Sequence, residues 1–335
     1  MTTAPATAAF SAHPALQHHW YPVANSAEVV GGPTKITLLG REYVLWRTGS
    51  GEIVSAPDRC PHREAPLSLG TVTDGGELEC PYHGWQFGAG GACVLVPSND
   101  PGLPVPPKAH LHTLRLVERY GLVWICPGEP TRDVPEIAEE HDPVFRRINN
   151  PVEVWATSAT RMVDNFLDIA HFPYVHTGSF GRRQNTRVPK VECSPLDDDF
   201  YGYGYEVEVN NPDLAMTASM QTAAVLTRRM TSGFHLPFTV RSTIDYETGL
   251  RHVLLLCSTP IDDVTSTFTF VVWRNDDFSV SAEDVVRLDR AIGAEDKVML
   301  ERLPGVLPLD TSATVSVQAD RCGVEWRRRF AALLA

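Results

Sequence analysis

The chain has 335 residues, of which 43% are apolar, and its formal net charge is −12, with 29 Lys and Arg against 41 Asp and Glu. This length suffices for one large domain or two ordinary ones, and the apolar content argues against disorder. The acidic balance disfavours a nucleic-acid partner, which needs a basic surface. No apolar run approaches the roughly 20 residues that span a bilayer, so we expect no membrane segment.

The first residues, "MTTAPATAAF", lack the basic start and continuous apolar core of a secretion signal. We therefore expect a short N-terminal tail and a cytoplasmic protein. The chain contains seven cysteines. Five are scattered singly, which indicates reduced thiols and not a disulfide framework: Cys93, Cys126, Cys193, Cys257 and Cys322. The other two require a different explanation.

Residues 36–128 show short alternations of apolar and polar residues, divided by glycine and proline, which predict many short strands. A polar stretch broken by prolines, 129–150, is expected to connect two domains. A helix is then predicted over "ATRMVDNFLDIAHF", residues 159–172, and Pro173 should end or bend it.

Three later segments are rich in β-forming residues and predict an antiparallel sheet: "FYGYGYEVEV", "RHVLLLCSTP" and "STFTFVVWRN". A helix is predicted over residues 282–303. The fold class is therefore α+β, with a small all-β domain followed by a larger domain in which helices flank an antiparallel sheet. The expected divisions are a tail at 1–17, the β domain at 18–128, the connection at 129–150 and the second domain at 151–335.

Two short stretches in the β domain each pair a cysteine with a histidine. "CPHREAPLSLG" carries Cys60 and His62, and "CPYHGW" carries Cys80 and His83. A structural zinc ion can use two Cys and two His, but zinc fingers usually pair like residues with like along the chain. One of each per stretch favours a [2Fe–2S] cluster in which one iron takes two cysteines and the other takes two histidines.

The residues around these stretches resemble the Rieske domain of the Rieske-type non-haem iron oxygenases. The resemblance is carried by Cys-Pro-His-Arg at 60–63, "LSLG", "GGELECPYHGWQF", "ERYGLVWI" and, near the start, "HHWYPVANSAEV". It implies a Rieske [2Fe–2S] cluster held by Cys60, His62, Cys80 and His83. Trp85 is expected to pack over that cluster.

A second motif, "DNFLDIAHFPYVH", lies in the predicted helix and holds two histidines, His171 and His176. A bend at Pro173 would let both imidazoles converge. Two histidines and one carboxylate form the facial triad of a non-haem Fe(II) site. Alone, the histidines could equally be buried core residues. Asp164, Asn165, Asp168 and the two histidines together resemble the family signature Asp/Glu-Asn-x-x-Asp-x-x-His-x-x-x-x-His.

The carboxylate of such a triad is sought on the last predicted helix. Its apolar stripe runs through Val285, Leu288, Ile292, Met299 and Leu303, and Asp296 falls in the gap of this stripe. A buried charge is costly unless it is paired or bound to a metal, and "AEDKVMLE" resembles the family segment that carries the third ligand. We therefore assign Asp296, while Glu295 and Asp289 lie at the edge of the stripe.

The resemblance has further implications for assembly and electron supply. It implies a head-to-tail homotrimer in which Asp168 bridges His83 of one chain and His171 of another. It also implies O₂ as co-substrate and electrons from NAD(P)H through a separate ferredoxin and/or flavin reductase. Asn165 would position a water or substrate near the iron, although a capping or core role is equally compatible with the sequence.

The compact chain resembles the family branch without a second subunit, which contains O- and N-demethylases and monooxygenases. Hydroxylation or oxidative demethylation of a small organic molecule is therefore the expected reaction. Aromatic cis-dihydroxylation is the alternative, and a Rieske electron carrier without a substrate is a further one. Four phenylalanines are candidates for the pocket lining, although such residues are more often plain core: Phe166, Phe180, Phe234 and Phe238.

Overall fold

The computed structural model describes residues 10–335, which divide into two compact units, one ending at Asp133 and the other beginning at Val134. Within the predicted tail, residues 1–9 lie outside the described residues. Two short 3₁₀ helices, Phe10–Ala12 and Pro14–His18, follow them, and Leu16 is fully buried. No helix within residues 10–335 is both long enough and apolar enough to cross a lipid bilayer.

The N-terminal unit is built from three small antiparallel sheets, β1-β10-β9, β2-β3-β4 and β5-β6-β7-β8. Its strands are β1 (Tyr21–Asn25), β2 (Thr34–Leu38), β3 (Arg41–Arg47), β4 (Ile53–Pro57), β5 (Thr71–Val72), β6 (Leu78–Glu79), β7 (Gln86–Phe87), β8 (Cys93–Leu95), β9 (Arg115–Arg119) and β10 (Leu122–Cys126). Their short, alternating sequences match the all-β prediction. One buried cluster includes Trp46, Leu67, Phe87 and both cysteines of the paired stretches.

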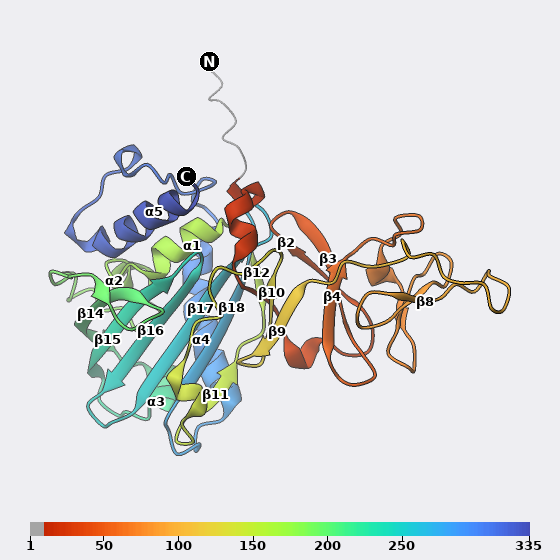
Figure 1. Cartoon of the computed structure of the whole chain (residues 1–335). Helices are drawn as coiled ribbons and strands as arrows, with labels where there is room; N and C mark the ends of the chain where they lie inside the picture. Colours follow the sequence, from red (N-terminus) through yellow and green to blue (C-terminus); the bar gives the residue numbers. More distant parts are fainter. Residues whose placement is uncertain (1–9) are drawn as a thin grey trace. The chain divides into compact units, whose positions relative to one another are not determined.

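The C-terminal unit contains one eight-stranded antiparallel sheet (Figure 1). The strands are β11 (Arg146–Asn149), β12 (Glu153–Trp155), β13 (Ser194–Pro195), β14 (Tyr201–Asn210), β15 (Val225–His235), β16 (Thr239–Tyr246), β17 (Arg251–Pro260) and β18 (Ser266–Arg274). The helices are α1 (Ala159–Phe166), α2 (Phe172–Val175), α3 (Asp213–Ser219), α4 (Ala282–Leu300) and α5 (Arg321–Leu333). Strand β11 thus falls within the stretch that the sequence assigns to the domain connection.

Helix α4 packs against α1, α2 and α3 at one face of this sheet. Ser281 caps its first turn, because the Ser281 side chain accepts a hydrogen bond from the backbone N–H of Asp284. The predicted stripe is correct at Val285, which is buried, but Met299 and Leu303 are exposed and Leu300 is buried instead. The helix ends at Leu300, so Leu303 lies beyond the periodic face.

The helix predicted over 159–172 is shorter than expected. α1 ends at Phe166, a turn follows, and α2 starts at Phe172. The Asp168 carboxylate accepts hydrogen bonds from the backbone N–H groups of Ala170 and His171, which stabilises a turn in place of helix. Pro173 is not the breaking residue, because it lies in the first turn of α2, where its missing N–H costs nothing.

Candidate metal centres and active-site pocket

Cys60 and Cys80 open two loops that follow the same backbone path. In each loop the cysteine N–H donates to the carbonyl five residues later, at 2.9 and 2.8 Å. The residue four positions after each cysteine, Glu64 or Gly84, is left-handed, with φ of 62° and 67°. Its N–H donates back to the cysteine carbonyl at 2.9 or 3.0 Å. The two loops therefore present their ligands alike, although their Cys–His spacings differ by one residue.

The four side chains of these loops converge. Cys60 and Cys80 are 1% and 2% exposed, and the ring centroids of His62 and His83 are 4.6 Å apart. Burial, together with the neighbouring Cys80, raises the pKa of the Cys60 thiol to about 11. The buried Nδ1 of His62 has no hydrogen-bond partner within residues 10–335. Two adjacent thiols and an unpartnered imidazole nitrogen fit a cluster that takes two Cys and two His ligands. Trp85 stacks on the His62 ring, with the ring centroids 4.5 Å apart.

The second constellation begins with two oriented histidines. His171 Nδ1 lies 3.1 Å from Asp168 Oδ2, and His176 Nδ1 lies 3.0 Å from Glu295 Oε2. Because an ionised carboxylate can only accept, each Nδ1 carries a proton, and each Nε2 is the ring nitrogen left for a metal. The hydrogen bonds thus fix the tautomer of both histidines, with both free nitrogens available to a metal.

These two free nitrogens meet a third donor. His171 Nε2 and His176 Nε2 are 3.1 Å apart, and Asp296 Oδ1 lies 3.4 Å from each of them. The Oδ1 atom is buried and has no hydrogen bond of good geometry within residues 10–335. Three donor atoms this close together repel one another unless a cation, either a proton or a metal ion, lies between them. The donor set therefore fits a divalent metal with two His and one carboxylate ligand.

The charges at this centre are coupled. Burial opposes the charged form of His171, yet Asp168 and Asp296 outweigh burial and raise the pKa of His171 to about 9. Burial likewise opposes ionisation of Asp296, but the nearby His171 and His176 hold its pKa below its ordinary value. The surrounding carboxylates thus favour a positive charge among His171, His176 and Asp296.

Glu295 orients His176, a role that the sequence did not reveal, because it indicated only that Glu295 lies at the edge of the apolar stripe of the last helix. Besides His176, it accepts hydrogen bonds from Ser179 Oγ at 2.6 Å and from the Gly178 N–H at 2.8 Å. Asn165 lies beside Asp296, and its Nδ2 has no acceptor of good geometry within residues 10–335. Asp164, the first residue of the motif, faces Arg327 instead of the metal ligands.

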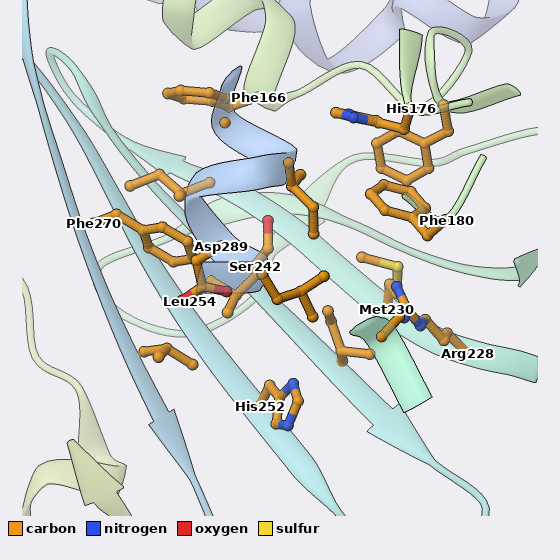
Figure 2. A pocket seen from close by; sticks show the side chains of 18 of the residues that line it. Phe166, His176, Phe180, Arg228, Met230, Ser242, His252, Leu254, Phe270 and Asp289 are labelled. Carbon is orange, nitrogen blue, oxygen red and sulfur yellow. The ribbon is translucent and has the colours of Figure 1, made fainter. Parts of the chain in front are cut away.

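A mostly apolar cavity of about 150 Å³ opens beside the three ligands. Its floor is the sheet, where every second residue of β15 to β18 points inward, ending with Phe268, Phe270 and Val272 on β18. Its opposite wall is α4 (Figure 2). Of the four candidate phenylalanines, Phe166 and Phe180 line this cavity, whereas Phe234 packs on Tyr201 and Phe238 on α5.

One acidic residue, Asp289, lies on the α4 wall of this cavity (Figure 2). Its Oδ2 accepts a hydrogen bond from Asn150 Nδ2 at 3.0 Å. Burial raises the pKa of Asp289 to about 7, although the Asn150 hydrogen bond and the charge of Arg274 act in the opposite direction. This carboxyl is the acidic group of the cavity that does not belong to the metal triangle.

The two candidate sites together indicate the class of protein. The paired Cys and His residues of the first domain fit an iron–sulfur cluster, and the two His and one Asp of the second domain fit a further metal beside a pocket. Family models match both halves, the Rieske [2Fe-2S] domain over residues 19–117 and the vanillate O-demethylase oxygenase C-terminal domain over residues 155–335. The latter covers more than half of the chain. The chain belongs to the Rieske non-haem iron oxygenases.

Individual relatives agree with this family. The chain is 32% identical to methylxanthine N1-demethylase NdmA of Pseudomonas putida, over 93% of this chain and 88% of the relative. It is 34% identical to the oxygenase component of dicamba O-demethylase from Stenotrophomonas maltophilia, over 48% of each chain. The structure of Pseudomonas putida NdmA with caffeine aligns with a TM-score of 0.82 at 30% identity, covering 96% of this chain and 91% of that one.

The protein is thus the oxygenase component of a multicomponent system, with a Rieske [2Fe–2S] cluster, a mononuclear iron, a small-molecule substrate and electron-transfer partners. The match of residues 155–335 to an oxygenase domain favours this function over an electron carrier without a substrate. The structural zinc site considered for the paired Cys/His stretches is likewise replaced by the Rieske cluster.

Glu295→Gln is expected to lower the affinity of the mononuclear site for Fe(II) by about 10- to 100-fold, because the His176 ring loses its charged acceptor. Competition with a ferrous chelator measures this affinity. The Rieske spectrum should not change. Glu283→Gln, on the exposed side of the same helix, is the matched control. Equal iron affinity in wild type and Glu295→Gln would contradict the orienting role.

Asp289→Asn is expected to change how stability depends on pH. The folded protein holds the Asp289 proton up to about pH 7, whereas the unfolded chain releases it near its ordinary pKa of about 4. Wild type should therefore lose stability relative to Asp289→Asn as pH rises between these values, and the difference should level off above them. Urea unfolding of both proteins across this range measures it. A pH-independent difference would show that the carboxyl titrates normally.

Proposed function

We propose that Cys60, His62, Cys80 and His83 bind the Rieske cluster. His171, His176 and Asp296 bind the mononuclear iron. When bound, the cluster relays electrons and the iron activates O₂ for insertion into a substrate bond. The observation that supports this assignment most strongly is the triangle of three donor atoms, 3.1 to 3.4 Å apart, at the edge of an apolar cavity.

The protein side chains around the iron site have separate tasks. Asp168 and Glu295 hold the protons on the Nδ1 atoms and aim both Nε2 lone pairs at one point. Phe180 packs against the His176 ring at 4.6 Å and excludes water from one side of it. The Nδ2 group of Asn165 is a buried donor at the cavity, suited to hold a water or a substrate oxygen near the ligands.

The reaction we infer is monooxygenation, either hydroxylation or hydroxylation followed by loss of a methyl group as formaldehyde. Support comes from the relatives of like length, which are named as N-demethylases of methylxanthines. The cavity is compact and largely apolar, in keeping with a small ring system. We propose that electrons reach the protein from NAD(P)H through a ferredoxin and/or flavin reductase, in the cytoplasm.

We further propose a head-to-tail homotrimer, in which Asp168 of one chain meets His83 of the next. The Asp168 side chain is 29% exposed although it is bound to His171, and the His83 ring is exposed in its own unit. Each group is therefore accessible to a partner. A heterologous contact of this kind closes into a three-membered ring when neighbouring chains are related by a rotation of one third of a turn.

His171→Ala is expected to remove the mononuclear iron and leave the cluster intact, because the two sites share no ligand. Iron should fall from about three to about two atoms per chain, while the rhombic resonance of the reduced cluster persists in electron paramagnetic resonance. In parallel, dithionite-reduced wild type is exposed to O₂ with N- and O-methyl heterocycles, including caffeine. Formaldehyde should form with wild type and not with His171→Ala.

Two outcomes of that experiment would contradict the proposal. A chain that holds cluster iron but never a third iron, even after anaerobic reconstitution, would exclude the iron site. A cis-diol formed from an arene would replace monooxygenation by dioxygenation.

Asp168→Asn is expected to keep both metal centres but slow electron transfer between chains severely, because the amide no longer offers a charged acceptor to both histidines. Stopped-flow reoxidation of the reduced cluster by O₂ in the presence of substrate measures this rate. Asp164→Asn, four residues earlier and outside the triangle, is the control. Unchanged reoxidation in Asp168→Asn with full iron content would refute the bridging role.

A further inference from the structure

Apart from the metal triangle, Arg274 and His252, the apolar cavity carries two ionisable groups on different walls. Asp289 lies on α4, beside Leu254 and Phe270, and Arg228 lies on β15, beside Met230 and Phe180 (Figure 2). Neither belongs to the metal triangle. In a cavity that is otherwise mostly apolar, a few polar groups fix the orientation of the ligand. These two groups are therefore the natural candidates for substrate recognition.

Asp289 and Asp296 share one face of α4, because seven residues make two turns. The rise between them is about 10.5 Å along the helix axis, so Asp289 marks the part of the cavity remote from the metal ligands. A carboxylate offers about four acceptor positions, and Asn150 Nδ2 occupies one of them. The remaining capacity of this carboxylate is available to a hydrogen-bond donor in the cavity.

Arg228 is 6% exposed, and the buried Nε of its guanidinium has no hydrogen-bond partner within residues 10–335. Its charge is stabilised by the rings of Phe180 and Tyr246, each 5.4 Å from the guanidinium carbon. Five N–H groups in a buried guanidinium need acceptors. Because Nε of Arg228 has no acceptor within residues 10–335, a ligand in the cavity can supply one.

The other polar groups of the cavity do not compete for these roles. Arg274 is fully buried, forms an ion pair with Asp276 and donates to the Ala218 carbonyl at 2.7 Å. His252 is buried, and burial together with the charges of Arg274 and Arg228 lowers its pKa well below the ordinary value, so the ring is neutral. Asp289 and Arg228 therefore supply the charges that a ligand can use.

We propose that this cavity recognises a compact nitrogen heterocycle by its two ends: an N–H donor bound by Asp289 and a hydrogen-bond acceptor, such as a carbonyl, bound by Arg228. The inference rests on the proposed function only in that the reacting carbon lies near His171, His176 and Asp296. A cavity of about 150 Å³ is the size that holds a single aromatic ring. A substrate with a carboxylate at the Asp289 end is repelled, and a plain hydrocarbon leaves both charges unpaired.

Two probes of equal size and opposite charge test the two ends separately: benzamidine, a donor, and benzoate, an acceptor. Binding is measured by calorimetry, without O₂, on the holoprotein at about pH 8, where Asp289 is ionised. Asp289→Asn should weaken benzamidine binding at least about tenfold and leave benzoate binding equal or tighter. Arg228→Gln should weaken benzoate binding by a similar factor and leave benzamidine binding equal or tighter.

Glu283→Gln, on the exposed side of α4, is the control and should bind both probes like wild type. Because Arg228 is buried, Arg228→Lys accompanies Arg228→Gln. It keeps the charge and should retain benzoate binding within a few-fold. Circular dichroism verifies the fold of each variant. Benzamidine binding that is absent in wild type or unaffected by Asp289→Asn would overturn the proposal, as would benzoate binding that is absent or unaffected by Arg228→Gln.

This binding measurement is independent of turnover. Loss of probe discrimination with three irons per chain would reject the recognition model and keep the oxygenase assignment. If a chain that never holds the mononuclear iron still discriminates between the two probes, the recognition model stands and the oxygenase assignment is rejected.

Discussion

The arrangement of the candidate iron site depends on one electrostatic constraint, the approach of two imidazole Nε2 atoms to 3.1 Å. Each ring is held in the tautomer that points its lone pair inward, because a carboxylate occupies its Nδ1 side. A buried third oxygen, on Asp296, lies 3.4 Å from both. Such an arrangement is repulsive without a cation and strongly attractive with one. The fold therefore stores a binding site whose unfavourable charges are relieved by metal.

Two local features bring the five side chains of this site together. The turn between α1 and α2 brings His171 and His176 together, and Asp168 stabilises that turn through backbone hydrogen bonds while also orienting His171. Neighbouring residues Glu295 and Asp296 of α4 then serve different histidines, one at Nδ1 and the other at Nε2. If α4 were shifted by one residue, Glu295 would take the place of Asp296. The register of α4 against the turn therefore determines which carboxylate faces the Nε2 atoms and which one orients a ring.

Much of this could be predicted from the sequence. The paired Cys/His stretches, the two histidines and Asp296 carry local signals, namely ligand residue types at characteristic spacings and a charge within an apolar stripe. The α+β class followed from strand alternation. The helix break could not be located, because Asp168 stabilises it through its own side chain and Pro173, the visible breaker, is tolerated in the first turn of α2.

The roles of Glu295, Asp289 and Arg228 were equally hidden from the sequence. Each depends on residues distant in the chain: Glu295 on His176, Asp289 on Asn150, and Arg228 on Phe180. An acidic residue at the edge of a helical stripe is usually solvated, and an arginine within an alternating strand usually faces water. Only the packing of α4 over the sheet brings these charges into one cavity.

The two orienting carboxylates differ in a way that bears on electron supply. Glu295 accepts hydrogen bonds from three separate residues, His176, Ser179 and Gly178, and 20% of its side chain is exposed. Within residues 10–335, Asp168 binds its own turn and His171, and 29% of its side chain is exposed. In the proposed homotrimer, the exposed part of Asp168 would accept a hydrogen bond from His83 of the neighbouring chain. The same carboxylate binds His171, so it would connect that chain to the proposed iron site.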